Sequence, residues 1–257
     1  MTPPEPYEEI NPGGGSDVLV LCDHASNVVP DAVGGGSLEL SQADMQRHIA
    51  YDLGARGVAV ELARLLDAPA VLSRFSRLVI DPNRGEDDPT LIMRIYDGTV
   101  VPGNRRLPDA ERARRLDRYH RPYHDAIDRR IDAMRAAGRD PGLIAVHSFT
   151  PQFRGRAPRP WHVGVLWHRD GRIAEPLIAR LRAEGDLCVG DNQPYAGQLE
   201  GDTLSRHGTG RGLRHVLIEL RHDLIDAPEA QRLWAARLAP ILIEIVGTDA
   251  HEEVRHG

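Results

Sequence analysis

Short apolar runs alternate with segments of helical periodicity along this chain of 257 residues. Runs with the length and composition of buried strands occupy residues 18–22, 70–75, 77–80, 143–146, 162–167 and 216–220. Apolar residues at helical spacing occupy residues 42–66, 109–137, 173–183 and 227–246. Strands that alternate with helices in this way predict an α/β fold with a mainly parallel central sheet flanked by helices.

The remaining segments set the expected domain organisation. Residues 1–16 are rich in proline and glycine, and we expect them to form a flexible arm. Residues 81–108 form a long irregular stretch with many turn residues, and a loop of this length inside a domain is often functional. Because no repeat or sharp compositional shift divides the rest, we expect a single domain over residues 17–257.

Composition argues against several classes of function. The formal net charge is -6 and all 32 basic residues are arginines spread along the chain, so no basic field favours nucleic acid as a partner. Only two cysteines occur, Cys22 and Cys188, which favours a reducing compartment over a disulfide framework. The N-terminus lacks the pattern of a signal peptide and no run of 18 apolar residues occurs, so we expect a cytoplasmic protein without membrane contact.

Ionisable residues follow several of the apolar runs, at the point where each predicted strand ends. His24, Asp81, His147 and Glu219 occupy such positions. In open α/β sheets, ligands bind in the crevice outside the carboxyl ends of the strands. These side chains are therefore predicted to meet at one edge of the sheet and to form an active site.

His24 and His147 are the candidate metal ligands. Each ends an apolar run, in the segments LCDHASN and IAVHSFT. Two neutral imidazoles and one carboxylate, with a fourth position for water, form a common ligand set of catalytic zinc. Taken singly, either histidine is equally well explained as a polar residue that caps a strand, and the metal hypothesis depends on the pair.

The sequence leaves the third ligand open. Asp52 lies in an otherwise apolar helical stretch, where a buried carboxylate needs an ion pair or a metal. Asp23 and Asp81 are further candidates. Asn27 stands three residues after His24, where a glutamate would complete a common metal-binding pattern, but an amide is a poor zinc ligand. An ion pair with an arginine, or a solvated helix face, is the alternative explanation for Asp52.

Glu219 is the candidate general base. It lies in the apolar run VLIELR, and apolar surroundings raise the pKa of a carboxyl group. A carboxylate with a raised pKa can activate water at neutral pH and then pass the proton to a leaving nitrogen. A buried ion pair with Arg221 or another arginine is the alternative.

The segment SRFSRLVIDPNR places three arginines around a predicted strand, namely Arg74, Arg77 and Arg84. Arg84 follows Asn83 on a predicted turn, where its guanidinium could bind a substrate carboxylate through two hydrogen bonds. Arg77 is a second candidate for this role, whereas Arg74 is equally well explained as a surface residue.

Other polar residues are weaker candidates. Arg206 and His207, in the segment TLSRHG, are candidates for substrate binding and for orienting the substrate or polarising its carbonyl, and a solvated loop is the alternative. Ser148, directly after His147, is a candidate for substrate binding. His120 and His124 lie four residues apart on a predicted helix. We interpret these two as helix-surface or helix-packing residues, because no strand end supplies a third ligand beside them.

Taken in order, six segments resemble the N-formylglutamate amidohydrolase family, over roughly residues 17–245. These segments are DHASNVVP, HIAYDLGA, SRLVIDPNR, AVHSFTP, TLSRHG and VLIELRHDLI. The family is similar in fold to zinc carboxypeptidases and aspartoacylase-type deacylases. The resemblance therefore implies a central mixed, mainly parallel sheet flanked by helices.

The resemblance also implies residue roles. His24 and His147 match the histidines that hold the metal, and Glu219 matches the glutamate that activates water. Asn83 and Arg84 resemble an Asn-Arg pair that binds a substrate carboxylate in the related enzymes.

The chain departs from the pattern of its relatives in its first motif. Carboxypeptidase-type relatives carry a carboxylate ligand where Asn27 stands. Either Asp52 supplies that oxygen ligand, or the metal is held more weakly and binds only with substrate present. The DHASN segment also differs from the version in deformylases of histidine degradation, which implies a divergent branch.

The implied activity is hydrolysis of the formyl amide of N-formyl-L-glutamate to formate and glutamate, with one divalent metal, expected to be Zn²⁺. The expected partner is a small N-acyl amino acid, and the expected assembly is a monomer or small homo-oligomer. The alternatives are a deacylase or amidase for another N-acyl amino acid or short peptide, and a binding protein that retains the fold without catalysis.

Overall fold

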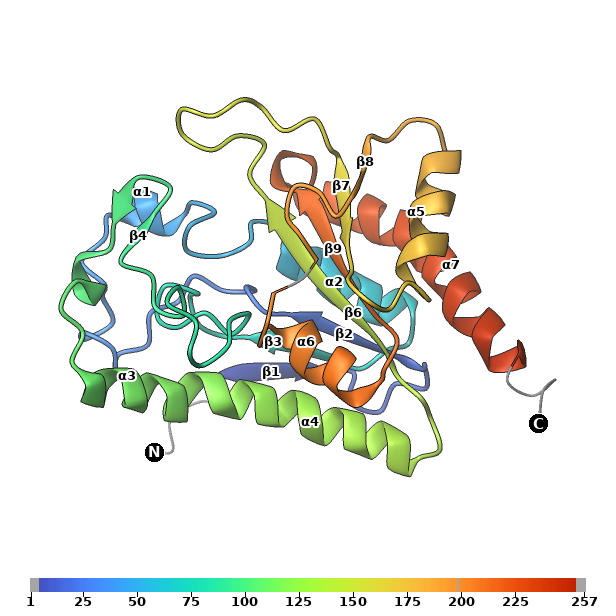
Figure 1. Ribbon diagram of the computed structural model, residues 1–257, viewed down its shortest axis with the longest axis horizontal. Helices are drawn as coiled ribbons and strands as arrows, with labels where there is room; N and C mark the ends of the chain where they lie inside the picture. Colours follow the sequence, from blue (N-terminus) through green and yellow to red (C-terminus); the bar gives the residue numbers. More distant parts are fainter. Residues whose placement is uncertain (1–4, 198, 253–257) are drawn as a thin grey trace.

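A seven-stranded sheet forms the centre of the computed structural model, which describes residues 5–197 and 199–252 (Figure 1). The strand order is β1-β3-β2-β6-β9-β7-β8. The strands are β1 (Tyr7–Ile10), β2 (Val18–Cys22), β3 (Ala70–Ser73), β6 (Gly142–Phe149), β7 (Val163–Leu166), β8 (Val189–Asp191) and β9 (His215–Arg221). Neighbours run parallel except in the β1–β3 and β7–β9 pairs. The predicted mixed, mainly parallel α/β sheet is thus confirmed.

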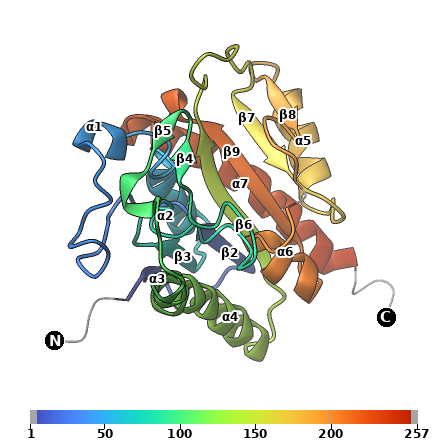
Figure 2. The ribbon, with the colours of Figure 1, turned by 60° about the vertical axis from the view of Figure 1, so that its left-hand side comes forward.

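Helices cover both faces of the sheet (Figures 1 and 2). One face packs against α2 (Ala55–Leu65), α5 (Ala174–Ala183) and α7 (Pro228–Glu252). The other packs against α4 (Arg121–Ala136), which continues α3 (Asp109–Arg115) through a π-helical turn, η2 (Leu116–His120). The helix predicted over residues 109–137 is confirmed, and Gly138 follows it with a φ of 77°. Such a left-handed residue after a helix is a common C-terminal cap.

The alternation of side chains along the strands divides the interior into two cores. In β6, Ile144 and Val146 belong to the core beneath α2, α5 and α7, whereas Leu143 and Ala145 belong to the core beneath α4. Because successive side chains of a strand point to opposite faces, residue 147 points to the α4 side. The same alternation places Leu217, and residue 219 after it, on that face of β9.

The N-terminal prediction is partly wrong. Residues Tyr7–Ile10 form β1, an edge strand antiparallel to β3, with Tyr7 opposite Ser73 and Ile10 opposite Ala70. Backbone pairing to β3 fixes this segment, so the flexible arm predicted over residues 1–16 is corrected over β1. Residues 1–4 lie outside the described part of the chain.

The single helix predicted over residues 42–66 is also wrong. The chain forms α1 (Gln42–Met45), then a nonhelical stretch, then α2 from Ala55. Gly54 begins α2 with a φ of 77°, and a Cβ at this position would lie 2.2 Å from the backbone oxygen of Ile225. The break directs the Asp52 backbone N–H to the His24 carbonyl oxygen at 3.0 Å. The interruption of the helical pattern therefore positions Asp52 at the end of β2.

Residues 77–80, predicted as a strand, form turns instead. The hydroxyl of Ser76 and the N–H of Arg77 both donate to the Ala50 carbonyl, at 2.7 and 3.2 Å. The Ser76 hydroxyl also accepts from the Leu78 N–H at 3.2 Å. These local bonds take the place of a strand ladder, and the burial of Leu78 and Ile80 explains why the sequence resembles a strand.

Shorter elements complete the fold. They are β4 (Ile95–Tyr96), β5 (Thr99–Val100), η1 (Pro102–Asn104), α6 (Thr203–His207), η3 (Thr209–Arg211) and η4 (His222–Leu224). The first three lie in the predicted irregular stretch, residues 81–108. Among the described helices, none combines the length and apolar character needed to cross a membrane.

Candidate active site

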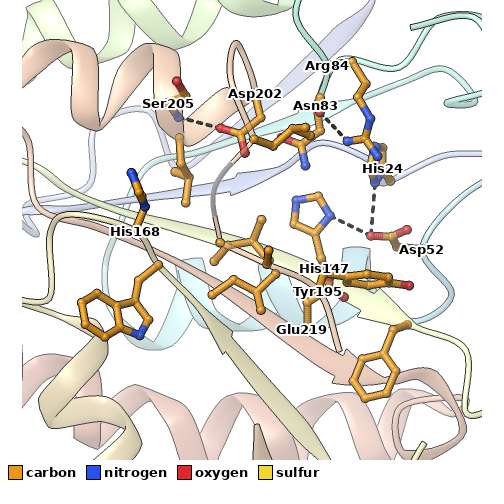
Figure 3. Close-up of a pocket in the computed structure, with 18 of the residues that line it drawn as sticks. His24, Asp52, Asn83, Arg84, His147, His168, Tyr195, Asp202, Ser205 and Glu219 are labelled. Carbon is orange, nitrogen blue, oxygen red and sulfur yellow. Dashed lines mark hydrogen bonds and ion pairs between the residues drawn. The ribbon is translucent and has the colours of Figure 1, made fainter. Parts of the chain in front are cut away.

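Three buried side chains converge at the carboxyl ends of β2 and β6. The Nδ1 atoms of His24 and His147 lie 3.3 and 2.9 Å from one carboxylate oxygen, Oδ2 of Asp52 (Figure 3). One donor atom from each residue lies within 4.8 Å of the others, and all three residues are buried. This set of two imidazoles and one carboxylate fits the tetrahedral ligand preference of Zn²⁺ and leaves a position for water.

Three different segments deliver these side chains. His24 follows β2, His147 lies near the end of β6, and Asp52 lies in the break before α2. β2 and β6 are parallel neighbours, so their carboxyl ends meet at the same edge. The two imidazole rings are packed edge to face, with centroids 4.9 Å apart.

Two further carboxylates hold the remote nitrogens of these rings. The Nε2 atom of His24 lies 2.6 Å from Oδ1 of Asp81, and Nε2 of His147 lies 2.8 Å from Oδ2 of Asp23. A carboxylate on the second nitrogen orients a metal-binding histidine and raises its basicity. Asp23 and Asp81, which the sequence offered as alternative third ligands, therefore occupy supporting positions, and Asp52 occupies the position between the rings.

The buried charged groups of this cluster shift one another's pKa values. Burial alone would raise the pKa of Asp52, but the charge of His24 and the hydrogen bond to His147 lower it. Burial alone would lower the pKa of His147, but its hydrogen bonds to Asp23 and Asp52 raise it well above the ordinary value. A carboxylate that stays ionised between two basic nitrogens is a suitable environment for a cation.

Glu219 lies beside the cluster, with one carboxylate oxygen that lacks a partner. In the ladder, Glu219 pairs with His147 of β6 and with Gly164 of β7. Among the described residues, its buried Oε2 atom has no hydrogen-bond partner. Burial raises the pKa of Glu219 to about 7, against the opposing attraction of His147. A carboxyl group with this pKa can exchange protons near neutral pH.

A cavity of about 650 Å³ opens onto these side chains. His24, Asp52, His147 and Glu219 line it, together with polar and aromatic residues from the loops that follow β6, β7 and β8. The close-up shows the rings of His24 and His147 directed toward the Asp52 carboxylate within this space (Figure 3). The cavity is large enough for a small amino acid derivative.

Arg84 and Asn83, predicted to bind substrate, both line this cavity. The Arg84 guanidinium donates to the Asn83 carbonyl at 2.7 Å and to the Thr90 hydroxyl at 3.2 Å. The Asn83 side-chain oxygen accepts from the Thr203 N–H at 3.1 Å, which ties it to the start of α6. These hydrogen bonds of Arg84 are with neutral groups, although its charge also opposes the rise that burial alone would cause in the pKa of the Asp81 and Asp202 carboxyl groups.

Arg77 and Ser148 also line the cavity, but their polar groups are engaged. Arg77 donates to Oδ2 of Asp81 at 2.8 and 3.1 Å and to Oδ1 of Asp52 at 3.4 Å. The Ser148 hydroxyl donates to the Leu53 carbonyl at 2.8 Å, and its N–H donates to Asp52 at 3.2 Å. These contacts support Asp52, and the predicted substrate role of both residues stays a prediction.

His207 and Arg206 are not among the residues that line the cavity, so this geometry does not support their predicted contact with substrate. His207 is fully buried. Its Nε2 atom lies 2.8 Å from Nδ1 of His124, and its Nδ1 atom lies 3.0 Å from Oδ1 of Asp128. Arg206 is exposed and lies 3.9 Å from Asp128. Both belong to α6, whose turn directs them toward α4. The predicted packing role of the α4 residue His124 agrees with these contacts.

Asn27 lies outside the convergent cluster. Its side-chain amide donates to the Met45 carbonyl at 2.9 Å, which ties the loop after β2 to α1. The departure from the carboxypeptidase-type pattern at this position therefore coincides with a hydrogen bond to the backbone, and the carboxylate that lies between the two rings is that of Asp52.

Several residues of the cavity carried no recognisable sequence signal. Tyr195 lies on the loop after β8, and its hydroxyl accepts from Arg159 at 3.0 Å. Asp202 caps α6 by accepting from the Ser205 N–H at 2.6 Å, and burial raises its pKa to about 6. His48 also lines the cavity, and burial lowers its pKa to about 4. Irregular loops carry all three, and periodicity says nothing about where such loops lie.

Known proteins similar to this chain point to one family. A sequence model described as N-formylglutamate amidohydrolase matches residues 16–226. An N-formylglutamate deformylase of Pseudomonas putida is 28% identical over 216 residues, which cover 77% of this chain and 76% of the relative. The corresponding protein of Pseudomonas aeruginosa is 28% identical over 218 residues and covers 77% of each chain.

Two solved structures share the fold. A gene product of Agrobacterium tumefaciens superimposes with a TM-score of 0.89 and 35% identity, over 96% of this chain and 97% of the other. An N-formylglutamate amidohydrolase of Ralstonia eutropha superimposes with a TM-score of 0.63 and 22% identity, over 95% of this chain and 98% of the other. Since the family match spans most of the chain and both strand-end histidines, this protein belongs to the N-formylglutamate amidohydrolase family.

Proposed function

We propose that this protein hydrolyses the formyl amide bond of N-formyl-L-glutamate, giving formate and L-glutamate, in a reaction that depends on a divalent metal. One observation carries the proposal: the convergent donor atoms of His24, Asp52 and His147 lie beside a buried carboxylate, Glu219, in one cavity. The names of the two Pseudomonas relatives support the choice of substrate.

The residues that would hold the metal are His24, Asp52 and His147, and Zn²⁺ suits their donor atoms. The chemistry that a divalent cation supplies at such a site is Lewis acidity, which polarises a carbonyl and lowers the pKa of water. With the ring hydrogens on the Nε2 atoms, which lie beside Asp23 and Asp81, the lone pairs of both Nδ1 atoms would be directed toward the centre of the cluster.

Glu219 acts as the general base and then as the general acid in the proposed reaction. Its carboxylate accepts a proton as a water oxygen attacks the formyl carbon, and a tetrahedral oxyanion forms. The carboxyl group then donates that proton to the amide nitrogen, the C–N bond breaks, and formate and glutamate leave. The position of Glu219 on the same sheet face as His147 supports this assignment, because the two side chains open onto one cavity.

Arg84, with Asn83 beside it, binds a carboxylate of the substrate in this proposal. Arg84 lines the cavity and its described hydrogen bonds are to neutral groups, so its guanidinium has donors for a carboxylate of the substrate. A guanidinium and a carboxylate form two parallel hydrogen bonds, which orient the substrate as well as bind it. Arg77 differs from Arg84 in this respect, because it already forms ion pairs with Asp81 and Asp52.

A direct assay tests the proposal. Purified protein, supplied with Zn²⁺, is incubated with N-formyl-L-glutamate, and formate release is measured with a coupled formate dehydrogenase. Release of the free amino acid, which every substrate of the panel gives on hydrolysis, is measured with ninhydrin. The N-acetyl and N-succinyl derivatives of glutamate and the N-formyl derivatives of other amino acids form the comparison panel. We expect the highest kcat/KM for N-formyl-L-glutamate. Faster release from another acyl group or amino acid, or no turnover of any substrate, would contradict the proposal.

A further inference from the structure

Two histidines of the helix α3–η2–α4 hold the backbone of the segment that carries Arg84. The His124 Nε2 atom lies 3.0 Å from the Pro82 carbonyl oxygen, and the His120 Nε2 atom lies 2.9 Å from the Arg84 carbonyl oxygen. His120 ends the π-helical turn η2, and such turns are rare and frequently occur at functional sites. The carbonyls on either side of Asn83 are therefore fixed from α4.

The first of these contacts continues into a chain of buried groups. His124 Nδ1 lies 2.8 Å from His207 Nε2, and His207 Nδ1 lies 3.0 Å from Oδ1 of Asp128. Both imidazoles are fully buried. The chain thus runs from the Pro82 carbonyl through two rings to the Asp128 carboxylate, and it occupies all four ring nitrogens.

Counting hydrogens along this chain fixes its charge. A carbonyl oxygen and a carboxylate oxygen only accept hydrogen bonds, so the ring nitrogen at each end must carry a hydrogen. The bond between the two rings needs one more hydrogen. Three hydrogens on two imidazoles are one more than two neutral rings carry, so the pair His124–His207 holds one positive charge when every bond is made.

The surroundings place that charge on His207. Asp128 is its anionic partner, although Arg211 also donates to the same oxygen at 2.7 Å and Arg206 lies 3.9 Å from the other. Asp132, on the next turn of α4, takes a second bond from Arg211 and offsets its charge.

On the side away from Asp128, His124 has no anionic partner among its described contacts. The ring centroids of His120 and His124 lie 4.5 Å apart, and Nε2 of His124 faces the neutral Pro82 carbonyl oxygen. Burial and the nearby His120 lower the pKa of His124 well below its ordinary value, which agrees with a neutral His124. Burial opposes ionisation of Asp128, but its hydrogen bond to His207 helps to lower its pKa to about 2.

We propose that His124 and His207 are positioning residues, a singly charged histidine pair that is anchored on Asp128 and fixes the Pro82 carbonyl. By fixing this carbonyl, the pair sets the positions of Asn83 and Arg84 at the cavity. Its kinetic consequence rests on the proposed function, in which Arg84 binds the substrate carboxylate. Loss of the pair should therefore weaken substrate binding more than it slows the chemical step.

Nitrogen NMR of the histidine side chains tests the charge count without any substrate. Full-length protein labelled with ¹⁵N-histidine is measured at pH 7, and His124→Gln and His207→Gln assign the two rings. We expect one ring with both nitrogens protonated, assigned to His207, and one neutral ring with its hydrogen on Nε2, assigned to His124. Two neutral rings would overturn the proposal, whatever the enzyme acts on.

A matched set of variants tests the positioning role. His124→Ala removes the bond to Pro82, whereas the amide of His124→Gln can still donate to Pro82 and accept from His207. His162→Gln is the control, because this histidine accepts from the Cys188 N–H at 2.9 Å and lies outside the cavity lining. Steady-state kinetics with N-formyl-L-glutamate and amide hydrogen exchange of residues 81–86 are the two measurements.

For His124→Ala we expect KM to rise about tenfold with kcat within about threefold, together with faster exchange in residues 81–86. His124→Gln and the control should stay close to wild type in both measurements. Equal effects of His124→Ala and His124→Gln, or unchanged exchange in a folded His124→Ala, would overturn the proposal. If His124→Ala does not fold, the NMR spectrum of the wild type decides. Absence of formate release from the wild type contradicts only the proposed function, because NMR and hydrogen exchange need no turnover.

Discussion

Two groups of buried histidines contact the segment of residues 81–84, and they use the same ring in different ways. In the first group, His24 and His147 direct Nδ1 toward Asp52 and are held by other carboxylates through Nε2. In the second, His124 and His207 bond to each other and end on Pro82 and Asp128. In the first group, two ring nitrogens face the same carboxylate oxygen, so three donor atoms meet at one point. In the second group, the ring nitrogens bond in series, and the two rings share no third donor. Convergence of donor atoms on one point, rather than the number of histidines, distinguishes a candidate metal site from a structural relay.

Replacement of one histidine in each group should give the largest difference between the two groups, in bound zinc. We expect His147→Ala to lose bound zinc and formate release, because two remaining ligands bind Zn²⁺ poorly. His124→Ala should keep its zinc. Metal content after dialysis, measured by inductively coupled plasma mass spectrometry, checks this. Zinc retained by His147→Ala, or lost from a folded His124→Ala, would reverse the assignment of the two groups.

Replacement of Glu219 by glutamine tests whether the first group needs a separate base. The amide keeps the shape of the side chain but cannot accept the proton from water. We expect kcat to fall about 10²- to 10⁴-fold, the usual contribution of a general base, while zinc content stays unchanged. Turnover close to that of the wild type would show that Glu219 is not the base.

The supporting carboxylates of the first group should tune metal affinity. Asp23→Asn replaces the ionised partner of His147 Nε2 with a neutral amide, and such changes cost about 10- to 100-fold in metal affinity. Competition with a chelator measures the affinity. Asp223→Asn is the control, since Asp223 is exposed and pairs with Arg221. Equal affinities of the two variants would contradict a supporting role for Asp23.

The segment between the two groups should set substrate affinity through Arg84. Arg84→Met keeps the length of the side chain but removes its charge, and we expect KM for N-formyl-L-glutamate to rise about tenfold or more. Arg74→Met serves as a control, because Arg74 does not line the cavity and is exposed. If N-formylglycine amide, which lacks both carboxylates, responds to Arg84→Met as strongly as N-formyl-L-glutamate does, Arg84 does not bind a carboxylate.

The second group should affect stability through Asp128, with the smallest effect. The folded-state pKa of Asp128 is lowered to about 2 from 3.8, so its ionised form stabilises the fold above pH 3.8. This contribution is lost as the pH falls through about 2. Urea unfolding should therefore find Asp128→Asn less stable than wild type at pH 7, with a difference that shrinks below pH 4. The effect is small, since Asp128 is partly exposed. A difference that grows on acidification would contradict the ion pair.

The sequence predicted the residues at strand ends well, for a geometric reason. Apolar runs identify β2, β6 and β9, and parallel neighbours place their carboxyl ends at one edge, so His24, His147 and Glu219 meet as expected. The same argument failed for residues 77–80, whose burial in turns imitates a strand.

The rest of the site depends on loops, which periodicity does not place. Asp52 appeared to lie within a helix, but a break at Gly54 brings it to His24. His207 appeared to be an accessible loop residue, yet it is fully buried against His124. Both outcomes depend on contacts between segments far apart in the chain, and no local pattern records such contacts.

The central claim is that His24, Asp52 and His147 bind the catalytic metal. Crystals soaked in Zn²⁺ and measured on both sides of the zinc absorption edge test it most directly. We predict an anomalous peak about 2.0–2.2 Å from both Nδ1 atoms and from a carboxylate oxygen of Asp52. A fully active enzyme whose only zinc peak lies elsewhere, or that shows no peak among these three residues, would contradict the account.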